Sequence, residues 1–319
     1  MTSRQATTAK ASSSTARPAD AALTLHASEA AAGSKPPPAR PQGGLYVTAT
    51  PIGNLGDVTL RALDLLAGAD VVACEDTRVT ARLLAHFGLR PSLQAYHEHN
   101  AARVRPQLLR RLAAGEIVVL VSDAGTPLIS DPGYKLVRAA LEEGLRVTAL
   151  PGASAVMAAL VLSGLPTDRF LFAGFLPPRS APRRAVLAEL AGVPATLVFL
   201  ESPRRLAASL RDMEALFGPR PAAVARELTK LFEEVQRAPL GELAQRYEAD
   251  GPPRGEVVVV VGPPEKSAAA SQADLDDMLR QALGHASLKE AAVAVSAATG
   301  LPRRAIYARA LALKAEDDG

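Results

Sequence analysis

The 319-residue sequence contains a single cysteine, Cys74, no tryptophan, and only 4% aromatic residues. One cysteine excludes a disulfide framework within the chain and a multi-cysteine metal site, which fits a protein of the reducing cytoplasm. No apolar run approaches the ~18 residues of a membrane span, and the N-terminus lacks the apolar core of a signal peptide. The shortage of aromatic side chains argues against a base-stacking platform and favours recognition of any RNA through phosphate contacts and shape.

The chain also carries little net charge. The formal charge of +3 arises from 36 basic and 33 acidic residues, which is too balanced to establish a nucleic-acid partner. Hydrophobic residues make up 48% of the chain, enough for two hydrophobic cores. Residues 1–43 are rich in Ala, Ser, Thr, Pro and Gly, and we expect a disordered tail there, with a transit peptide as the less favoured interpretation.

From residue 45 onward, strand-like and helix-like segments alternate. The segments LYVTA, ADVVACED, EIVVLVS and RVTAL predict strands, and the helical segments between them predict a parallel or mostly parallel sheet. Asp57 is the expected N-cap of the first helix. A second block of strands and helices begins near Phe170 and ends with GEVVVVVG. We therefore predict two α/β domains at residues 44–166 and 167–264, and a small helical extension at 273–316, for which a plain helical appendage is preferred to a helix–turn–helix.

Four loops follow predicted strands, and function in open α/β sheets gathers at such loops. They are TPIGNLGD (50–57), ACEDTR (73–78), SDAGTPLISDPG (122–133) and LPGAS (150–154). Gly53, Gly125 and Gly152 would let the backbone approach a ligand closely, although each loop alone could be an ordinary tight turn. No lysine is placed for a β- or γ-phosphate, and no G-x-G-x-x-G follows the first strand, so ATP and NAD are disfavoured. A nucleoside that carries positive charge, such as a sulfonium cofactor, suits these neutral loops but is not singled out by them.

Five segments together resemble a known family. TPIGNLGDVTLRAL, CEDTR, SDAGTPLISDPG, LPGASA and RELTK are similar to the RsmI family, bacterial S-adenosylmethionine-dependent enzymes that 2′-O-methylate a cytidine in the decoding centre of 16S rRNA. The resemblance covers about residues 45–262, and the helical tail is similar to that family's C-terminal extension. It implies the tetrapyrrole methylase (class III) fold with the cofactor cleft between two α/β domains, a homodimer, and the small ribosomal subunit as partner. The Gly125-Thr126-Pro127 sequence replaces the Gly-Asp-Pro of other members and favours the RNA-modifying branch.

The resemblance also implies which residues contact S-adenosylmethionine. Together with Gly53 from the glycine argument, the expected cofactor-binding residues are Pro51, Gly53, Ala124, Gly125, Thr126, Ile129, Ser154, Ala155, Glu201 and Ala238. The last two come from the second domain, whose loops diverge most within the superfamily.

Transfer of a methyl group to a ribose hydroxyl requires alignment and is helped by a base. Glu75, Asp76 and Lys230 are the candidate catalytic residues, and the candidate substrate-binding residues are Arg78, His97, Arg204, Arg205 and Glu227. Each has a structural alternative: Asp76 could cap a helix, Glu75 could pair with Arg78, and Glu227 could pair with Lys230. The pattern His-x-His at 97–99 shows no evident third ligand, so no metal is expected.

Arginine clusters provide further candidates for RNA contact, although a charge run is more often a solvated face. They are Arg103, Arg105, Arg110 and Arg111; Arg179, Arg183 and Arg184; and Arg204 with Arg205. Two other functions stay open at this point. One keeps the fold and cofactor but uses a tetrapyrrole or a protein side chain as the acceptor, and the other is a non-catalytic ribosome-binding protein.

Overall fold

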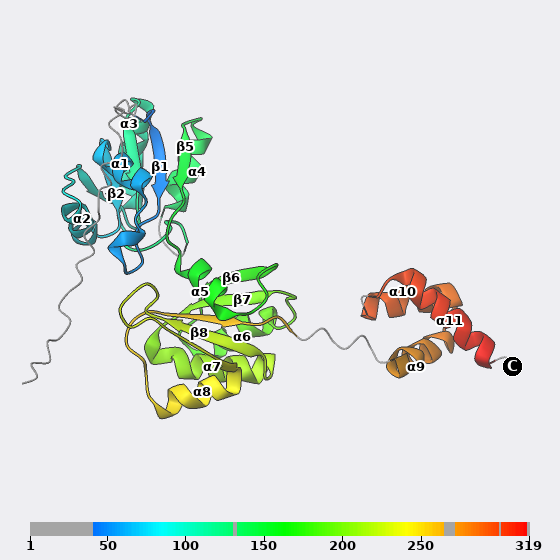
Figure 1. Cartoon of the computed structure of the whole chain (residues 1–319). Helices are drawn as coiled ribbons and strands as arrows, with labels where there is room; N and C mark the ends of the chain where they lie inside the picture. Colours follow the sequence, from blue (N-terminus) through cyan, green and yellow to red (C-terminus); the bar gives the residue numbers. More distant parts are fainter. Residues whose placement is uncertain (1–40, 130–132, 265–271, 300, 318–319) are drawn as a thin grey trace, which may run out of the picture. The chain divides into compact units, whose positions relative to one another are not determined.

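The computed structural model describes residues 41–129, 133–264, 272–299 and 301–317; the predicted disordered tail therefore lies almost entirely outside the described residues. The first sheet consists of five parallel strands in the order β3-β2-β4-β1-β5 (Figure 1). Its strands are β1 (Gly44–Thr48), β2 (Val71–Cys74), β3 (Leu93–Ala95), β4 (Ile117–Leu120) and β5 (Val147–Leu150). The parallel sheet predicted from the sequence is confirmed. The short, half-buried strand β3 was not predicted.

Both faces of this sheet are covered, which is why its strands are continuously apolar. The helices are α1 (Leu60–Ala67), α2 (Thr77–His86), α3 (Ala101–Ala113) and α4 (Tyr134–Glu142). Helices α3 and α4 pack over one face, whose core includes Val118 and Leu120, and α1 and α2 pack over the other, whose core includes Val119 and Cys74. The thiol of Cys74 is fully buried, as a small apolar side chain would be.

The predicted cap of the first helix is wrong. Asp57 ends a short 3-10 helix, Leu55–Asp57, and Thr59 caps α1 by accepting a hydrogen bond from the N–H of Ala62 at 3.1 Å. Threonine directly before the apolar helix satisfies a free donor of the first turn, and Asp57 lies two residues too early to do so.

The second sheet has the order β6-β7-β10-β8-β9. Its strands are β6 (Phe170–Phe175), β7 (Thr196–Glu201), β8 (Pro221–Arg226), β9 (Glu234–Pro239) and β10 (Val257–Val261). Only β6 and β7 pair in parallel, and the other neighbours are antiparallel. Strand β9 was not predicted, because the sequence EVQRAP of this edge strand is largely polar and none of its residues is fully buried.

Helices cover both faces of the second sheet as well. Helices α6 (Ser180–Leu190), α7 (Leu206–Phe217) and α8 (Leu240–Ala249) form one layer with a large apolar core. The opposite face packs against α5 (Ala155–Ser163), the helix that follows β5 of the first sheet. Helix α5 and residue Ile52 therefore join a common core with β7, β8 and β10. The chain of the first domain thus contributes directly to the core of the second.

Three further helices form a separate apolar core near the C-terminus. They are α9 (Gln272–Leu283), α10 (Leu288–Thr299) and α11 (Arg303–Asp317), and their core includes Leu279, Val295 and Ile306. Arg309 of α11 forms a two-pronged ion pair with Asp276 of α9, with distances of 2.6 and 2.7 Å. Among the helices described here, none has both the length and the hydropathy to cross a membrane.

Candidate active site

Hydrogen bonds join the four predicted loops at the carboxyl edge of the first sheet. Thr50 and Gly125 exchange backbone hydrogen bonds at 2.9 and 3.0 Å. The hydroxyl of Thr50 donates to the carbonyl oxygen of Ser122 at 3.1 Å, and the hydroxyl of Thr126 donates to the carbonyl oxygen of Ala153 at 3.1 Å. Both partners of each bond are protein groups, so these bonds fix the positions of the loops relative to one another.

A cavity of about 430 Å³ opens beside these loops, and we call it the larger cavity. Its walls come from both sheets and from the start of α5, and they combine apolar side chains with a few polar groups. Seven of the ten predicted cofactor-binding residues line it: Ala124, Gly125, Thr126, Ile129, Ser154, Ala155 and Glu201. The remaining lining residues are Ile52, Val156, Phe175, Leu200, Ser202, Pro203, Gly255, Glu256, Val257 and Val258.

Gly125 and Ser154 show why these residue types occur at the larger cavity. Gly125 has a φ of +77°, which a side chain disfavours, and an added Cβ would lie 3.2 Å from Cγ2 of Ile52. Ser154 caps α5, with its hydroxyl 3.4 Å from the N–H of Met157. The N-terminus of α5 therefore begins at the cavity wall, where backbone N–H groups favour an anionic group. Gly152, in contrast, packs against Ala49.

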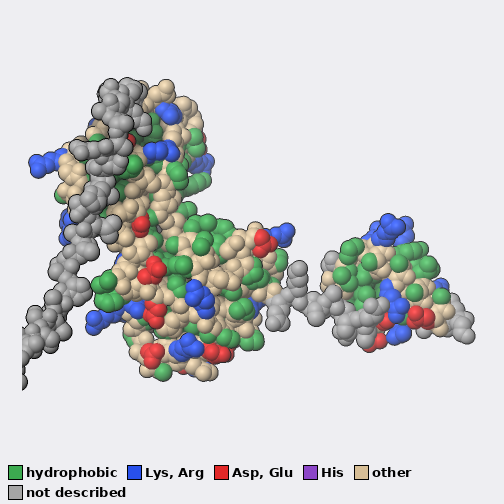
Figure 2. Space-filling view, in the orientation of Figure 1, with side chains coloured by type: hydrophobic (Ala, Val, Ile, Leu, Met, Phe, Trp, Pro, Cys, Tyr) green, Lys and Arg blue, Asp and Glu red, His purple; other side chains and the backbone are tan. Residues whose placement is uncertain are grey.

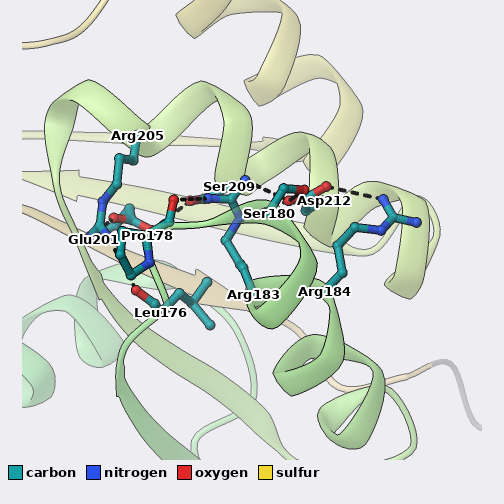
Figure 3. Close-up of polar contacts among 9 residues, drawn as sticks. All are labelled: Leu176, Pro178, Ser180, Arg183, Arg184, Glu201, Arg205, Ser209 and Asp212. Carbon is teal, nitrogen blue, oxygen red and sulfur yellow. Dashed lines mark hydrogen bonds and ion pairs between the residues drawn. The ribbon is translucent and has the colours of Figure 1, made fainter.

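Glu201 is a buried carboxylate at the end of β7 (Figure 3). One of its oxygens accepts hydrogen bonds from the N–H of Ser202 at 2.6 Å and pairs with Arg205 at 2.8 Å, and the other accepts from the hydroxyl of Ser209 at 2.6 Å. Three partners keep this charge satisfied inside the protein. Arg205 is therefore engaged with Glu201 and with the carbonyl oxygen of Leu176 at 3.3 Å, so its predicted contact with substrate would have to compete with these bonds.

A second cavity, of about 320 Å³, adjoins the first, and we call it the smaller cavity. The two cavities share Ile52, Ala124 and Glu256 as lining residues. The other residues around the smaller cavity are Thr50, Pro51, Gly53, Leu55, Val79, Arg82, Leu83, Asp123 and Lys230. The structure thus places the predicted residues Pro51, Gly53 and Lys230 together, next to the larger cavity.

Lys230 reaches this place from the turn between β8 and β9. Its ammonium group pairs with Glu227 at 2.8 Å and with Glu256 at 3.2 Å, and its aliphatic stem lies against Gly53, where a Cβ atom would overlap with Cγ of the lysine. Burial disfavours the charged lysine, but the hydrogen bonds that Lys230 donates to Glu227 and Glu256 outweigh this effect and raise the pKa of Lys230. The side chain is therefore a cation at neutral pH and is suited to an anionic partner, whereas a neutral amine would be needed to remove a proton.

Asp76 caps α2 and binds Arg78. Its carboxylate accepts from the backbone N–H of Arg78 at 2.8 Å and pairs with the guanidinium at 2.6 Å. The Arg78 side chain is the main reason why the pKa of Asp76 is lowered to about 2, which makes this carboxylate a weak base. The ion pair considered for Glu75 and Arg78 is wrong, because Arg78 binds Asp76 instead. Glu75 is half-buried beside this pair.

The structure also shows polar groups that sequence reasoning missed. Asp123 lines the smaller cavity, and its carboxylate accepts a hydrogen bond from the N–H of Asp76 at 3.0 Å. Its position directly after a buried strand was a signal for it. Glu256 also faces both cavities, but nothing in its local sequence indicated that it would meet Lys230.

Other predicted residues lie outside the two cavities. Ala238 lies on β9 at the edge of the core formed with α7 and α8. His97 is half-buried and follows β3. The centroid of its ring lies 6.0 Å from that of His99 in an edge-on arrangement, and its Nδ1 has no hydrogen-bond partner among the described residues. Arg204 is exposed near the end of β7.

Two arginines of one predicted cluster bind a carboxylate of the protein itself. Arg183 is 4% exposed and pairs with Asp212 at 2.7 Å, and Arg184 binds the same carboxylate at 3.1 Å (Figure 3). The expectation that Arg183 contacts RNA is wrong, because its guanidinium is used inside the protein. On the face shown in Figure 2, basic side chains are scattered among acidic and hydrophobic ones, as the small net charge suggests.

Comparison with known proteins defines the class first. Residues 44–244 match the family model described as Tetrapyrrole (Corrin/Porphyrin) Methylases, and residues 269–314 match one described as RsmI C-terminal HTH domain. The fold is similar to that of the cobalamin biosynthetic enzyme cobalt precorrin-4 methyltransferase, with a TM-score of 0.53 and 21% identity over 68% of this chain and 94% of the other. It is also similar to diphthine synthase, with a TM-score of 0.53 and 18% identity over 68% and 89% of the two chains. The protein is thus a methyltransferase of the tetrapyrrole methylase class, and S-adenosylmethionine is its cofactor.

Closer relatives define the family. The chain is 53% identical to a ribosomal RNA small subunit methyltransferase I of Mesorhizobium japonicum, over 88% of this chain and 97% of that protein. It is 45% identical to the protein of the same name from Escherichia coli O157:H7, over 85% and 95% of the two chains. The chain therefore belongs to the ribosomal RNA small subunit methyltransferase I family. The description of its C-terminal match favours a helix–turn–helix over the plain helical appendage that we preferred from the sequence.

Proposed function

We propose that this protein transfers a methyl group from S-adenosylmethionine to the 2′-hydroxyl of a cytidine ribose in the decoding centre of 16S rRNA. The observation that carries the proposal is the pair of adjoining cavities, which share Ile52, Ala124 and Glu256. A methyl transfer needs a donor site and an acceptor site in contact, and two such cavities supply them. The names of the closely similar relatives, which describe ribosomal RNA small subunit methyltransferases, support rRNA as the acceptor.

The larger cavity suits the cofactor. Its volume of about 430 Å³ falls in the usual range for small-molecule sites. Apolar walls from Ile52, Val156 and Leu200 offer contact to an adenine ring, and the N-terminus of α5 at Ser154 suits the carboxylate of the methionine part. The buried carboxylate of Glu201 provides a negative charge in the cavity wall. The hydroxyl of Thr126 already binds Ala153, so we propose that Thr126 acts by holding its loop.

The smaller cavity suits the acceptor ribose and its phosphate. Lys230 supplies a positive charge there, and Asp123 supplies a hydrogen-bond acceptor for a hydroxyl. The Lys230 stem rests against Gly53, and Pro51 lines the same cavity. We propose that Glu227 orients Lys230, and that Glu75, Asp76, Arg78, His97 and Arg204 form the rim along which the RNA approaches.

The bound cofactor supplies a methyl group activated by a sulfonium. With the cofactor held in the larger cavity and the ribose in the smaller one, the residues around the two cavities would align the ribose oxygen with that methyl group. The hydroxyl proton leaves to a carboxylate or to water. Because the pKa of Asp76 is about 2 and Lys230 is charged, neither group is tuned as a strong base. We therefore assign most of the rate enhancement to alignment, which contributes up to roughly 7–11 kcal/mol in favourable cases.

The test is methyl transfer from labelled S-adenosylmethionine to small ribosomal subunits, to naked 16S rRNA and to a tetrapyrrole precursor. Label in a cytidine 2′-O position is the expected result. Calorimetry with the cofactor distinguishes an inactive preparation from a non-catalytic ribosome-binding protein, which would show no cofactor binding. Label in the tetrapyrrole, with none in RNA, would overturn the proposal in favour of the other acceptor class.

We further propose that the protein works as a homodimer in the cytoplasm. The family resemblance supports the dimer, and the assembly of small ribosomal subunits in bacterial cytoplasm supports the location. Light scattering of the purified protein, which gives its mass in solution, tests the dimer directly: a monomeric mass at working concentrations would overturn it.

A further inference from the structure

The turn between β8 and β9 exposes two adjacent apolar side chains beside the smaller cavity. Leu231 is 89% exposed and Phe232 is 68% exposed. Lys230, the residue before them, directs its side chain to Gly53 and Glu256 and lines the cavity. Two residues of chain span at most about 7 Å, so the Phe232 backbone lies within that distance of the Lys230 backbone.

This turn is held in one conformation by its own hydrogen bonds. The N–H of Lys230 donates to the carbonyl oxygen of Glu227 at 3.0 Å, and the N–H of Thr229 donates to the carboxylate of Glu233 at 2.7 Å. Glu227 and Thr229 adopt φ values of +51° and +64°, which are unfavourable for residues with a side chain. Backbone strain of this kind persists where surrounding contacts over-determine it, and it concentrates at functional sites. The turn is therefore built to present Lys230 inward and its two apolar neighbours outward.

We propose that Phe232 stacks on a nucleobase of the RNA next to the methylated ribose, with Leu231 packing beside it. This inference rests on the proposed function and adds a residue that positions the substrate. An aromatic ring on a rigid turn loses little conformational freedom on binding, and base stacking on such a ring tolerates any sequence. The scarcity of aromatic residues excludes a broad stacking platform, but it leaves room for one ring placed at the acceptor site.

A second copy of this chain is the competing partner for the same side chains. Two side chains of at most about 250 Å² each provide far less than the ~800 Å² per partner of a stable interface. Along the chain the apolar pair is also bounded by a charge, because Glu233 follows Phe232 and is exposed. Both observations favour a small, flat partner such as a nucleobase.

The experiment uses the full chain, S-adenosylmethionine and small ribosomal subunits that lack the 2′-O-methyl group. We expect F232A to weaken binding of the subunits about 5- to 100-fold, the range found for removal of base-stacking aromatics, while cofactor affinity stays within about twofold of wild type. F170A is the matched control. Phe170 is also an exposed phenylalanine, but it lies at the start of β6, whereas Phe175 at the end of the same strand lines the larger cavity.

Because the chain has no tryptophan, F232W introduces a single indole fluorophore at the turn. Its emission should be quenched by a subunit or by a single-stranded RNA of the decoding-centre sequence, and F170W should not respond. Unchanged subunit binding by F232A, an unquenched F232W, or conversion of F232A to a monomer would each overturn the inference. If wild type binds the cofactor but labels no ribose, the proposed function fails instead, and quenching of F232W still reports on stacking independently.

Discussion

The contact between Gly53 and Lys230 offers a way to move a proposed active-site cation without replacing it. In Gly53→Ala, the new Cβ would overlap with Cγ of Lys230 and come close to Cδ and Cε as well. Because the overlap involves the base of the side chain and not its flexible end, the whole lysine stem has to swing out of the smaller cavity. The ammonium group then leaves Glu227 and Glu256 and no longer faces the acceptor site.

Gly53→Ala should lower activity much more than it lowers stability. Lys230 is 28% exposed and Glu256 is 75% exposed, so their ion pairs are screened by solvent, and we expect the free energy of unfolding to fall by no more than about 1 kcal/mol. A hydrogen bond to a charged group contributes about 1.5–3 kcal/mol. Loss of the contact between Lys230 and an RNA phosphate should therefore lower kcat/KM about 10- to 100-fold.

The assay is steady-state methyl transfer to small ribosomal subunits, with unfolding in urea measured in parallel. G53A and K230M should each lose activity by a similar factor, and the double variant should lose no more than either one, since both changes remove the same contact. G192A is the control, because a Cβ at Gly192 meets no atom within 4 Å. Full activity in G53A, or losses that multiply in the double variant, would refute the placement of Lys230 at the acceptor site.

Three further predictions concern the cofactor loop, a helix cap and a buried ion pair. G125A and G115A should each lose about 1–2 kcal/mol of stability, because both glycines have left-handed φ values. Only G125A should weaken cofactor binding in calorimetry. Equal cofactor affinities of the two variants would contradict the placement of the cofactor beside Gly125. The folded-state pKa of Asp76 is about 2, below the ordinary aspartate value of 3.8. Its stabilising effect is therefore present above pH 4 and is lost as the pH falls through 2. The difference in unfolding free energy between wild type and D76N should shrink over that range, and a constant difference would show that the ion pair does not form. R183M should lower the free energy of unfolding by about 3 kcal/mol, because it leaves Asp212 buried with one strong partner fewer. In urea unfolding, the double variant R183M/D212L should regain most of this loss. A double variant that is less stable than R183M would contradict the prediction.

Local sequence predicted best the loops that follow the strands of the first sheet. Glycine and proline directly after apolar strands indicated turns at a sheet edge, and the structure places Ala124, Gly125 and Ser154 around one cavity. Residues of the second domain were harder to place. Glu201 lines the cavity, whereas Ala238 belongs to the core of the α7 and α8 layer. A strand residue points to one face or the other, and the register that decides the face depends on partners distant in sequence.

Charged residues were harder still, because their roles depend on what they meet. Arg183 and Arg204 have similar arginine-rich surroundings in the sequence, but Arg183 is buried against Asp212 and Arg204 is exposed. A local pattern contains no information about the carboxylate that a long side chain reaches from another helix. The same reason explains why Asp76 was correctly considered as a helix cap, an interaction within three residues, while its bond with Asp123 was not foreseen.

Sequence by itself therefore determined the features that arise from neighbouring residues. These are the parallel first sheet with its continuously apolar strands, the turns that follow them, the cap at Asp76, and the family to which the motifs belong. Only the tertiary structure decided that α5 packs on the second sheet, that Lys230 lies on Gly53, and that Phe232 faces solvent in the turn that carries Lys230 to the smaller cavity. Such contacts join segments far apart in the chain, and their geometry follows from the packing of whole elements against each other.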